Sequence, residues 1–293
     1  IFENHPELLS FLHQGDVVIA DRGFNRVTEA FEERGISIVT PLSAEEGESQ
    51  LDTIEANRTR FVTHIRYRVE KFFGMLQSKF KYFSGTLRMT NIKWDMQAYR
   101  ICGALLNKFH FSTPTGAQYP EALERFIARR ELENKLWRVV EEVQPRLLHG
   151  RTTTLFSRIR KDQIDELLPI EPLDYYDLYM ISNGPYQIDN ARSYYGIDGE
   201  EDDALTPFKM EVFVGATTLP EIDYQDQFNI DIEQDNAVLV RAQVPSRHST
   251  RKRRMLLVLF DKSKFGYETV REYYCKCSAG ARTAGCCSHV MSV

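Results

Sequence analysis

The sequence contains no long apolar run. Its longest uninterrupted apolar run, Met255 to Phe260, has six residues, whereas a helix needs about 20 to cross a bilayer. The chain starts at Ile1, and no charged-then-apolar leader follows. We therefore expect no membrane partner and no signal peptide, and we expect a fragment cut from a longer protein.

Cysteine is also scarce, and its placement argues against a disulfide framework. Of the five cysteines, Cys102 stands alone and the other four lie within the last 20 residues. Disulfides that staple a fold would be spread over it. The clustering therefore indicates metal binding in a reducing compartment, and Cys102 is expected to be a core residue.

Acidic residues are few in one part of the chain. Between Arg58 and Lys108 there are 11 lysines or arginines but only two acids, Glu70 and Asp95, which gives +9 locally in a chain of net charge −5. A basic block of this kind attracts polyanions. A merely solvated basic face would have the same composition, and the sequence leaves both interpretations open.

The clustered cysteines have the spacing of a metal site. Cys275, Cys277, Cys287 and His289 form the pattern C-x-C-x₉-C-x-H. Three thiolates and one imidazole make a closed tetrahedral shell that suits structural Zn²⁺. Cys286 could take the place of Cys287, and the spacing does not decide between them.

The N-terminal segment is predicted to be a parallel α/β unit with an acid at the end of a strand. The apolar runs Val17–Ala20 and Ile36–Val39 have the form of buried strands, and a helix expected between them makes the pair parallel. Asp21 follows the first strand at its C-terminal end, where open α/β sheets place their ligand chemistry. A turn or cap aspartate would have the same spacing.

The stretch Ala56–Gly85 has apolar residues in steps of three and four, which predicts an amphipathic helix. Glu70 lies at the edge of its apolar face, among basic residues. Asp21 and Glu70 together could hold Mg²⁺ or Mn²⁺, because hard divalent cations prefer carboxylate oxygens. The alternative for Glu70 is a surface residue engaged in salt bridges.

Further helices are predicted at Met96–His110 and at Glu121–Glu142 from their apolar periodicity. Four strand-like runs follow: Lys209–Val214, Ala237–Val244, Met255–Asp261 and Tyr267–Tyr274. Arg251 and Lys252 fall in the basic segment 246–254 between two of these runs. We expect this segment to be an exposed hairpin loop. Its cations could either bind phosphate or simply be solvated.

Two of these stretches carry a resemblance to a known family. The sequences IADRGF, at Ile19–Phe24, and RYRVEKFFGML, at Arg66–Leu76, resemble the second and third acidic motifs of Harbinger-like DDE transposases. The resemblance covers about residues 10 to 110. It implies an RNase H-like core whose Asp, Asp and Glu bind two divalent metals and cut or join DNA.

By this resemblance Asp21 is the second acid and Glu70 the third. The family's first aspartate lies on an earlier strand that this sequence does not contain. We therefore expect the chain alone to be inactive, even where the parent protein cleaves DNA.

The C-terminal pattern resembles a SWIM-type zinc finger and matches it at all four ligand positions. The expected fold is thus α/β with a partial RNase H-like core, a helical linker and a small α+β zinc-binding domain. The three parts span residues 1–111, 112–204 and 205–293. SWIM modules are linked to DNA or protein binding, so the resemblance adds protein partners to the expectations and leaves oligomerisation open.

The sequence thus predicts a fragment of a DDE transposase whose parent cleaves and joins DNA with Mg²⁺ or Mn²⁺ and carries structural Zn²⁺. DNA-backbone contacts are expected from six basic residues: Arg66, Arg68, Lys71, Lys79, Arg251 and Lys252. The family implies location in the nucleus. The alternative function is a non-catalytic zinc-binding adaptor derived from a transposon.

Overall fold

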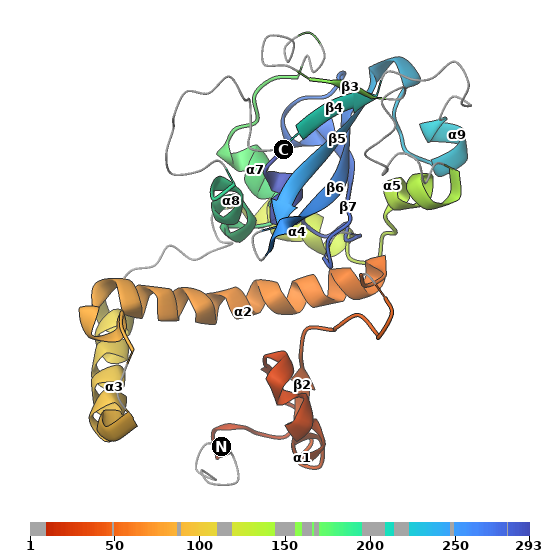
Figure 1. Ribbon diagram of the computed structural model, residues 1–293. Coiled ribbons are helices and arrows are strands. Elements are labelled where there is room, and N and C mark those ends of the chain that lie inside the picture. The colour runs from red at the N-terminus through yellow and green to blue at the C-terminus, as the bar shows by residue number, and fades with distance from the viewer. Residues whose placement is uncertain are drawn as a thin grey trace. The chain divides into compact units, whose positions relative to one another are not determined.

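The computed structural model has mixed α/β content and describes residues 10–48, 50–86, 89–109, 119–143, 156–159, 166, 170–194, 209–213, 223–246, 249–279 and 281–293. The chain divides into two compact units (Figure 1). The first unit comprises residues 1–42 and 59–118, and the second comprises 43–58 and 119–293. Both boundaries predicted for the linker, at residues 112 and 204, lie outside the described residues.

The first unit contains the predicted parallel strand pair. Strand β1, Val17–Ile19, pairs in parallel with β2, Ser37–Val39, so that Val18 lies opposite Ile38. A 3₁₀ helix, Arg22–Val27, and helix α1, Thr28–Glu32, connect the two strands. The β-branched residues of both strands favour this pleated conformation, and the prediction of a strand–helix–strand order is confirmed.

A long helix is confirmed over most of the predicted stretch as α2, Thr53–Lys79, but it ends six residues before the predicted end at Gly85. It begins earlier than expected because the Asp52 carboxylate accepts a hydrogen bond of 2.7 Å from the Glu55 amide and so caps the helix. Two 3₁₀ turns, Lys81–Phe83 and Met89–Asn91, lead to helix α3, Ile92–Phe109. A small apolar core of the first unit is built from both helices and the turn between them: Leu76, Phe83 and Leu106.

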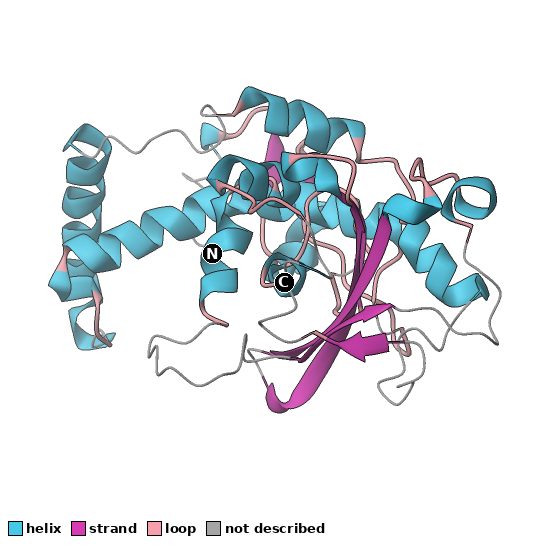
Figure 2. Cartoon of the chain, turned by 90° about the horizontal axis from the view of Figure 1, so that it is seen from above, coloured by secondary structure: helices cyan, strands magenta, loops and turns pink. Residues whose placement is uncertain are grey.

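A five-stranded antiparallel sheet forms the centre of the second unit, and most strand residues belong to it (Figure 2). Its strand order follows the sequence: β3 Phe156–Arg158, β4 Lys209–Phe213, β5 Ala237–Ser246, β6 Ser249–Asp261 and β7 Val270–Cys275. Two 3₁₀ turns lie beside these strands, Gln234–Asn236 before β5 and Gly266–Thr269 before β7. Of the helices in the described ranges, none is both long and apolar enough to span a membrane.

Both faces of this sheet are buried where apolar residues follow one another without alternation, at residues 237–240 of β5 and 255–260 of β6. One face packs against helix α7, Tyr175–Ser182, and against the short helix α10, Ser288–Met291. The other packs against α5, Lys135–Arg138, a π-helical turn that continues it, Val139–Val143, and α9, Tyr224–Phe228. Figure 1 shows α7 and α9 on opposite sides of the strands. Helix α8, Pro185–Arg192, packs beside α7 and α10.

A buried ion pair joins two of the strands. Arg241 of β5 lies directly opposite Glu211 of β4, and its Nε donates to the Glu211 carboxylate at 2.9 Å. The Arg241 guanidinium also stacks on the Phe156 ring at 3.9 Å. Separating this buried pair is costly, so it disfavours any slip in the register of the two strands.

The single helix predicted over Glu121–Glu142 is wrong. The structure has helix α4, Pro120–Ala128, then a break, and α5 begins only at Lys135, capped by the Asn134 side chain, which accepts from the Trp137 amide at 2.8 Å. In the break, the Thr283 hydroxyl lies 2.9 Å from the Arg129 carbonyl oxygen and 3.0 Å from that of Leu132. A distant segment thus satisfies carbonyls that a continuous helix would bond internally.

Asn57, in the first turns of α2, ties three segments of the second unit together. It is fully buried. Its Nδ2 donates to the Arg130 carbonyl and to the Thr283 hydroxyl, both at 2.9 Å. Its Oδ1 accepts from the amides of Thr283, at 2.8 Å, and Ala284, at 3.0 Å. All of the carboxamide's polar atoms are therefore used, in a place that water does not reach.

We predict that Asn57→Ala lowers the free energy of unfolding of the second unit by about 2–4 kcal/mol, because it leaves two buried amides without acceptors. The measurement is urea unfolding of the zinc-loaded protein in a Trp94→Phe background, in which Trp137 is the remaining tryptophan. Asn236→Ala is the matched control, since the Asn236 carboxamide makes one exposed bond to Glu233. Equal effects of the two substitutions would contradict the prediction.

Candidate functional site

Asp21 stands at the C-terminal end of β1, as the sequence predicts. The ladder continues through Ala20, whose amide donates to the Val39 carbonyl at 3.0 Å. The Asp21 Oδ1 atom accepts from the Arg22 amide at 2.8 Å and caps the 3₁₀ helix. One carboxylate oxygen is thus fixed by the backbone, and the side chain as a whole is 61% exposed.

Glu70 lies on α2, and its side chain is 50% exposed. Arg66, one turn earlier, donates from Nη2 to Glu70 Oε1 at 3.0 Å, the i, i+4 spacing at which helical side chains meet. The same Nη2 atom lies 3.5 Å from Asp21 Oδ2. A single guanidinium therefore contacts both predicted catalytic carboxylates.

This arrangement limits the distance between the two acids. Because both oxygens contact one nitrogen, Asp21 Oδ2 and Glu70 Oε1 cannot be farther apart than the sum of 3.0 and 3.5 Å, or 6.5 Å. Two oxygens on one Mg²⁺ lie within about 4 Å of each other, and two such ions are spaced by about 3.5–4 Å. The donor set and its spacing fit divalent cations after small side-chain rotations.

Both alternative roles that the sequence left open are also present. Asp21 is a cap, and Glu70 is engaged in a salt bridge. The cap uses only Oδ1 of Asp21, and the salt bridge is to a partially exposed arginine, which a stronger cation can displace. The two acids are therefore brought together without being locked in a structural role.

The other predicted DNA contacts divide between the two units. On α2, Arg68 and Lys79 are exposed, and Lys71 is half-buried. The segment predicted as an exposed hairpin loop is mostly strand instead, because β6 begins at Ser249 and pairs with β5 there. Arg251 and Lys252 thus lie in β6, and their side chains are outside what the structure describes. The DNA contacts stay predictions.

The C-terminal cysteines and histidine come together in the second unit. Cys275 ends β7, Cys287 precedes α10 and His289 lies in its first turn. The ligand atoms of Cys275, Cys277, Cys287 and His289 all lie within 4.8 Å of one another. Tetrahedral zinc with Zn–S bonds of about 2.3 Å places its sulfurs about 3.8 Å apart, so the group needs to contract by only about 1 Å.

The chemistry of this cluster fits a cation at its centre. Hydrogen bonds from the Cys275 and Cys287 thiols lower the pKa of Cys277 well below its usual value, whereas burial raises the pKa of Cys275. His289 Nδ1 is buried and has no hydrogen-bond partner among the described residues. A divalent cation would stabilise all three thiolates together. The cluster is therefore compatible with a structural zinc site.

The structure also distinguishes between the two adjacent cysteines. Both are buried, but the group that could hold a metal contains Cys287 and not Cys286. Gly285 precedes them with φ = +69°, a left-handed conformation that other residues adopt at a cost. A Cβ there would approach the Ser182 carbonyl oxygen to 2.6 Å. Glycine at this position therefore lets the loop turn close to α7 before it reaches Cys287.

Residues 1–107 match the family model described as DDE superfamily endonuclease. The match contains both Asp21 and Glu70 and supports the transposase family resemblance of this part of the chain. The family implies DNA as the substrate and the use of divalent metal ions. No curated protein and no solved structure gives a significant match to the sequence.

The sequence alone does not show that Arg66 lies between the two acids. It predicts a contact of Arg66 with the DNA backbone, and the structure adds contacts with Asp21 and Glu70. Its i, i+4 spacing to Glu70 was a usable signal, whereas the contact with Asp21 depends on tertiary structure. The roles of Asn57 and Thr283 left no signal in the sequence, because they arise from backbone carbonyls and amides of distant segments.

We predict about one zinc ion per chain when the protein is purified under reducing conditions and analysed by elemental mass spectrometry. Cys277→Ser and Cys287→Ser should remove most of it, since three remaining ligands hold zinc more weakly. Cys286→Ser and Cys102→Ser are the matched controls and should retain it. Loss of zinc in Cys286→Ser with retention in Cys287→Ser would overturn this ligand set.

Proposed function

We propose that the first unit carries two acids of a DDE-type nuclease centre that acts on DNA phosphodiesters. The observation that carries the proposal is the convergence of Asp21 and Glu70 on one guanidinium, within the segment that matches the endonuclease family. The two carboxylates come from a strand end and from a neighbouring helix, 49 positions apart in the sequence. An RNase H-like core belongs to the same proposal.

In this proposal, Asp21 and Glu70 hold Mg²⁺ or Mn²⁺ through their carboxylate oxygens. Bound divalent cations supply an activated water or 3′-hydroxyl and stabilise the leaving oxygen of the phosphodiester. The hydrogen bond from the Arg22 amide fixes the orientation of the Asp21 carboxylate, so that its Oδ2 stays directed to the site. Glu70 is positioned by the rigid helix α2.

Arg66 has two roles in the proposal. While no metal is bound, its positive charge offsets the repulsion between the two carboxylates. When a divalent cation takes its place, the guanidinium is released toward a DNA phosphate, for which it is a good ligand. The sequence-based assignment of Arg66 to DNA and its observed contact with the acids are thus two states of one side chain.

The family resemblance includes a third acid, an aspartate on an earlier strand. Among the described residues, no third carboxylate joins Asp21 and Glu70 in a metal-competent group. Cleavage is therefore to be measured on a protein that contains this chain together with such a strand. The chain itself supplies two ligands, the arginine between them and a basic helix surface.

The remaining predictions extend the proposal. Arg68, Lys71 and Lys79 of α2 would hold the DNA backbone, within the block of local charge +9. Residues 205–293 would include a SWIM-type zinc finger with structural zinc that binds DNA or protein. A protein of this kind would act in the nucleus.

We predict that Asp21→Asn and Glu70→Gln each lower Mn²⁺-dependent DNA cleavage by more than about 100-fold, because even outer partners of metal ligands cost about 10–100-fold. Cleavage of a labelled duplex is the measurement, and a DNA-binding assay on the same samples should show unchanged affinity. Glu29→Gln, at an exposed position of α1, is the matched control. Cleavage retained in Asp21→Asn and Glu70→Gln would contradict the assignment of these two acids, whereas absence of Mn²⁺-dependent cleavage by the unsubstituted protein would favour the adaptor function.

A further inference from the structure

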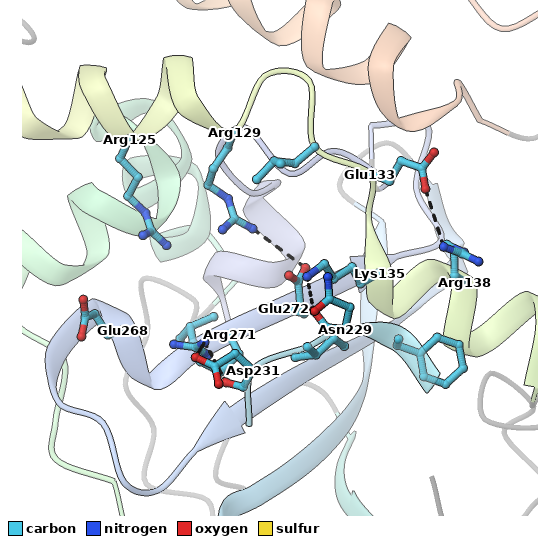
Figure 3. A pocket seen from close by; sticks show the side chains of 14 residues that line it. Arg125, Arg129, Glu133, Lys135, Arg138, Asn229, Asp231, Glu268, Arg271 and Glu272 are labelled. Atoms are coloured by element: carbon cyan, nitrogen blue, oxygen red, sulfur yellow. Dashed lines mark hydrogen bonds and ion pairs between the residues drawn. The ribbon is translucent and has the colours of Figure 1, made fainter. Parts of the chain in front are cut away.

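A pocket of about 380 Å³ lies in the second unit, apart from both sites described above (Figure 3). It is bordered by the end of α4, by α5, by the segment after α9 and by β7. Its volume falls in the range of small-molecule pockets, about 300–1,000 Å³. Five basic and four acidic residues line it: Arg125, Arg129, Lys135, Arg138 and Arg271, with Glu133, Asp231, Glu268 and Glu272.

Arg125 and Arg129 both point into this pocket from the end of α4, one helical turn apart (Figure 3). The Arg125 guanidinium lies over the Tyr267 ring at 5.0 Å and makes no ion pair within the described residues. Burial, and then the charge of Arg129, lower the pKa of Arg125. The protein thus holds a partly buried positive charge with a like charge beside it, and Glu268 attracts this charge without forming an ion pair with it.

The other charged residues of the pocket form only long ion pairs with one another. The shortest N–O distances are 3.9 Å for Arg129 with Glu272, 3.7 Å for Arg271 with Asp231 and 3.9 Å for Arg138 with Glu133. Charge-assisted hydrogen bonds are about 2.7–2.9 Å long, so none of these pairs is fully formed. Burial also raises the pKa of Glu272, which disfavours its negative charge. The net charge of the residues that line the pocket is therefore positive.

The pocket also has an apolar wall. Leu132, Phe228, Ile230 and Val270 line it beside the charged residues, and the last three are buried. A ligand that fills the space would place an anionic group on the arginines and an uncharged, flat or apolar group on this wall. A nucleotide has both parts and a suitable size.

We propose that this pocket binds a nucleotide through its terminal phosphate, with Arg125 and Arg129 as the phosphate ligands. Two guanidinium groups that approach from one side present several donors to an anion. A phosphate monoester, with three terminal oxygens and a charge near −2, uses more of them than a carboxylate does. The phosphate could belong to a free nucleotide or to the 5′ end of a DNA strand, which have the same chemistry.

The test is isothermal titration calorimetry of the zinc-loaded full chain with thymidine 5′-monophosphate, thymidine and inorganic phosphate. The monophosphate should bind more tightly than inorganic phosphate, and thymidine should not bind measurably. Arg125→Gln should weaken binding by about tenfold or more, the effect of losing one hydrogen bond to a charged group. Arg125→Lys should lose less, because it keeps the charge.

Arg130→Gln is the matched control. Arg130 lies in the same break between α4 and α5, pairs with Glu131 at 2.6 Å and does not line the pocket. It should bind the monophosphate as the unsubstituted chain does. Thermal unfolding of each variant shows whether the fold is kept. This separates loss of the phosphate ligand from loss of structure, and Arg129 is left intact because its Nε also bonds Thr283.

Two oligonucleotides of one sequence, one with a 5′-phosphate and one with a 5′-hydroxyl, show whether the bound phosphate belongs to a DNA strand end or to a free nucleotide. Preference for the phosphorylated end assigns the pocket to a DNA strand end, and equal binding of the two with tight monophosphate binding assigns it to a free nucleotide. Equal binding of thymidine and its monophosphate, or equal losses in Arg125→Gln and Arg130→Gln, would overturn the proposal. Asp21→Asn should change none of these values, so the result is independent of the nuclease proposal.

Discussion

The contact of one guanidinium with two carboxylates determines what the first unit can do. Asp21 and Glu70 are both partly exposed and both negative, and Arg66 lies between them at 3.5 and 3.0 Å. A positive charge between two nearby carboxylates stabilises their charged forms. The Arg66 side chain provides this charge here, and in the proposed function a divalent cation takes its place. The fold supplies the geometry by placing Asp21 at a strand end and Glu70 on a long helix.

In the second unit, the loop between Cys277 and Cys287 bonds backbone carbonyls that a continuous helix would bond internally. Thr283, between the second and third zinc ligands, is bound by Asn57 and in turn bonds the carbonyls where α4 ends. The same break turns Arg129 toward the phosphate pocket and allows α5 to begin at Lys135 on its other side. The candidate zinc site, the helix interruption and the basic pocket are thus connected by one loop and the few buried hydrogen bonds that hold it.

Patterns that repeat locally could be predicted from the sequence. The strand pair β1–β2 and helix α2 followed from apolar periodicity, and three members of the candidate zinc site, Cys275, Cys277 and His289, followed from spacing. The choice of Cys287 over Cys286 did not, since it depends on the left-handed turn at Gly285. The break in the predicted helix Glu121–Glu142 could not be predicted, because its cause is a hydroxyl about 150 positions later.

The most direct test of the central claim is anomalous diffraction at the manganese edge from crystals of the chain soaked in Mn²⁺. The account predicts a peak at about 2.1 Å from a carboxylate oxygen of Asp21 or Glu70, or of both, the distance of hard divalent cations from oxygen ligands. It also predicts that the Arg66 guanidinium moves away from both acids. A map without a peak there, with Arg66 still between the carboxylates at saturating Mn²⁺, would contradict the account.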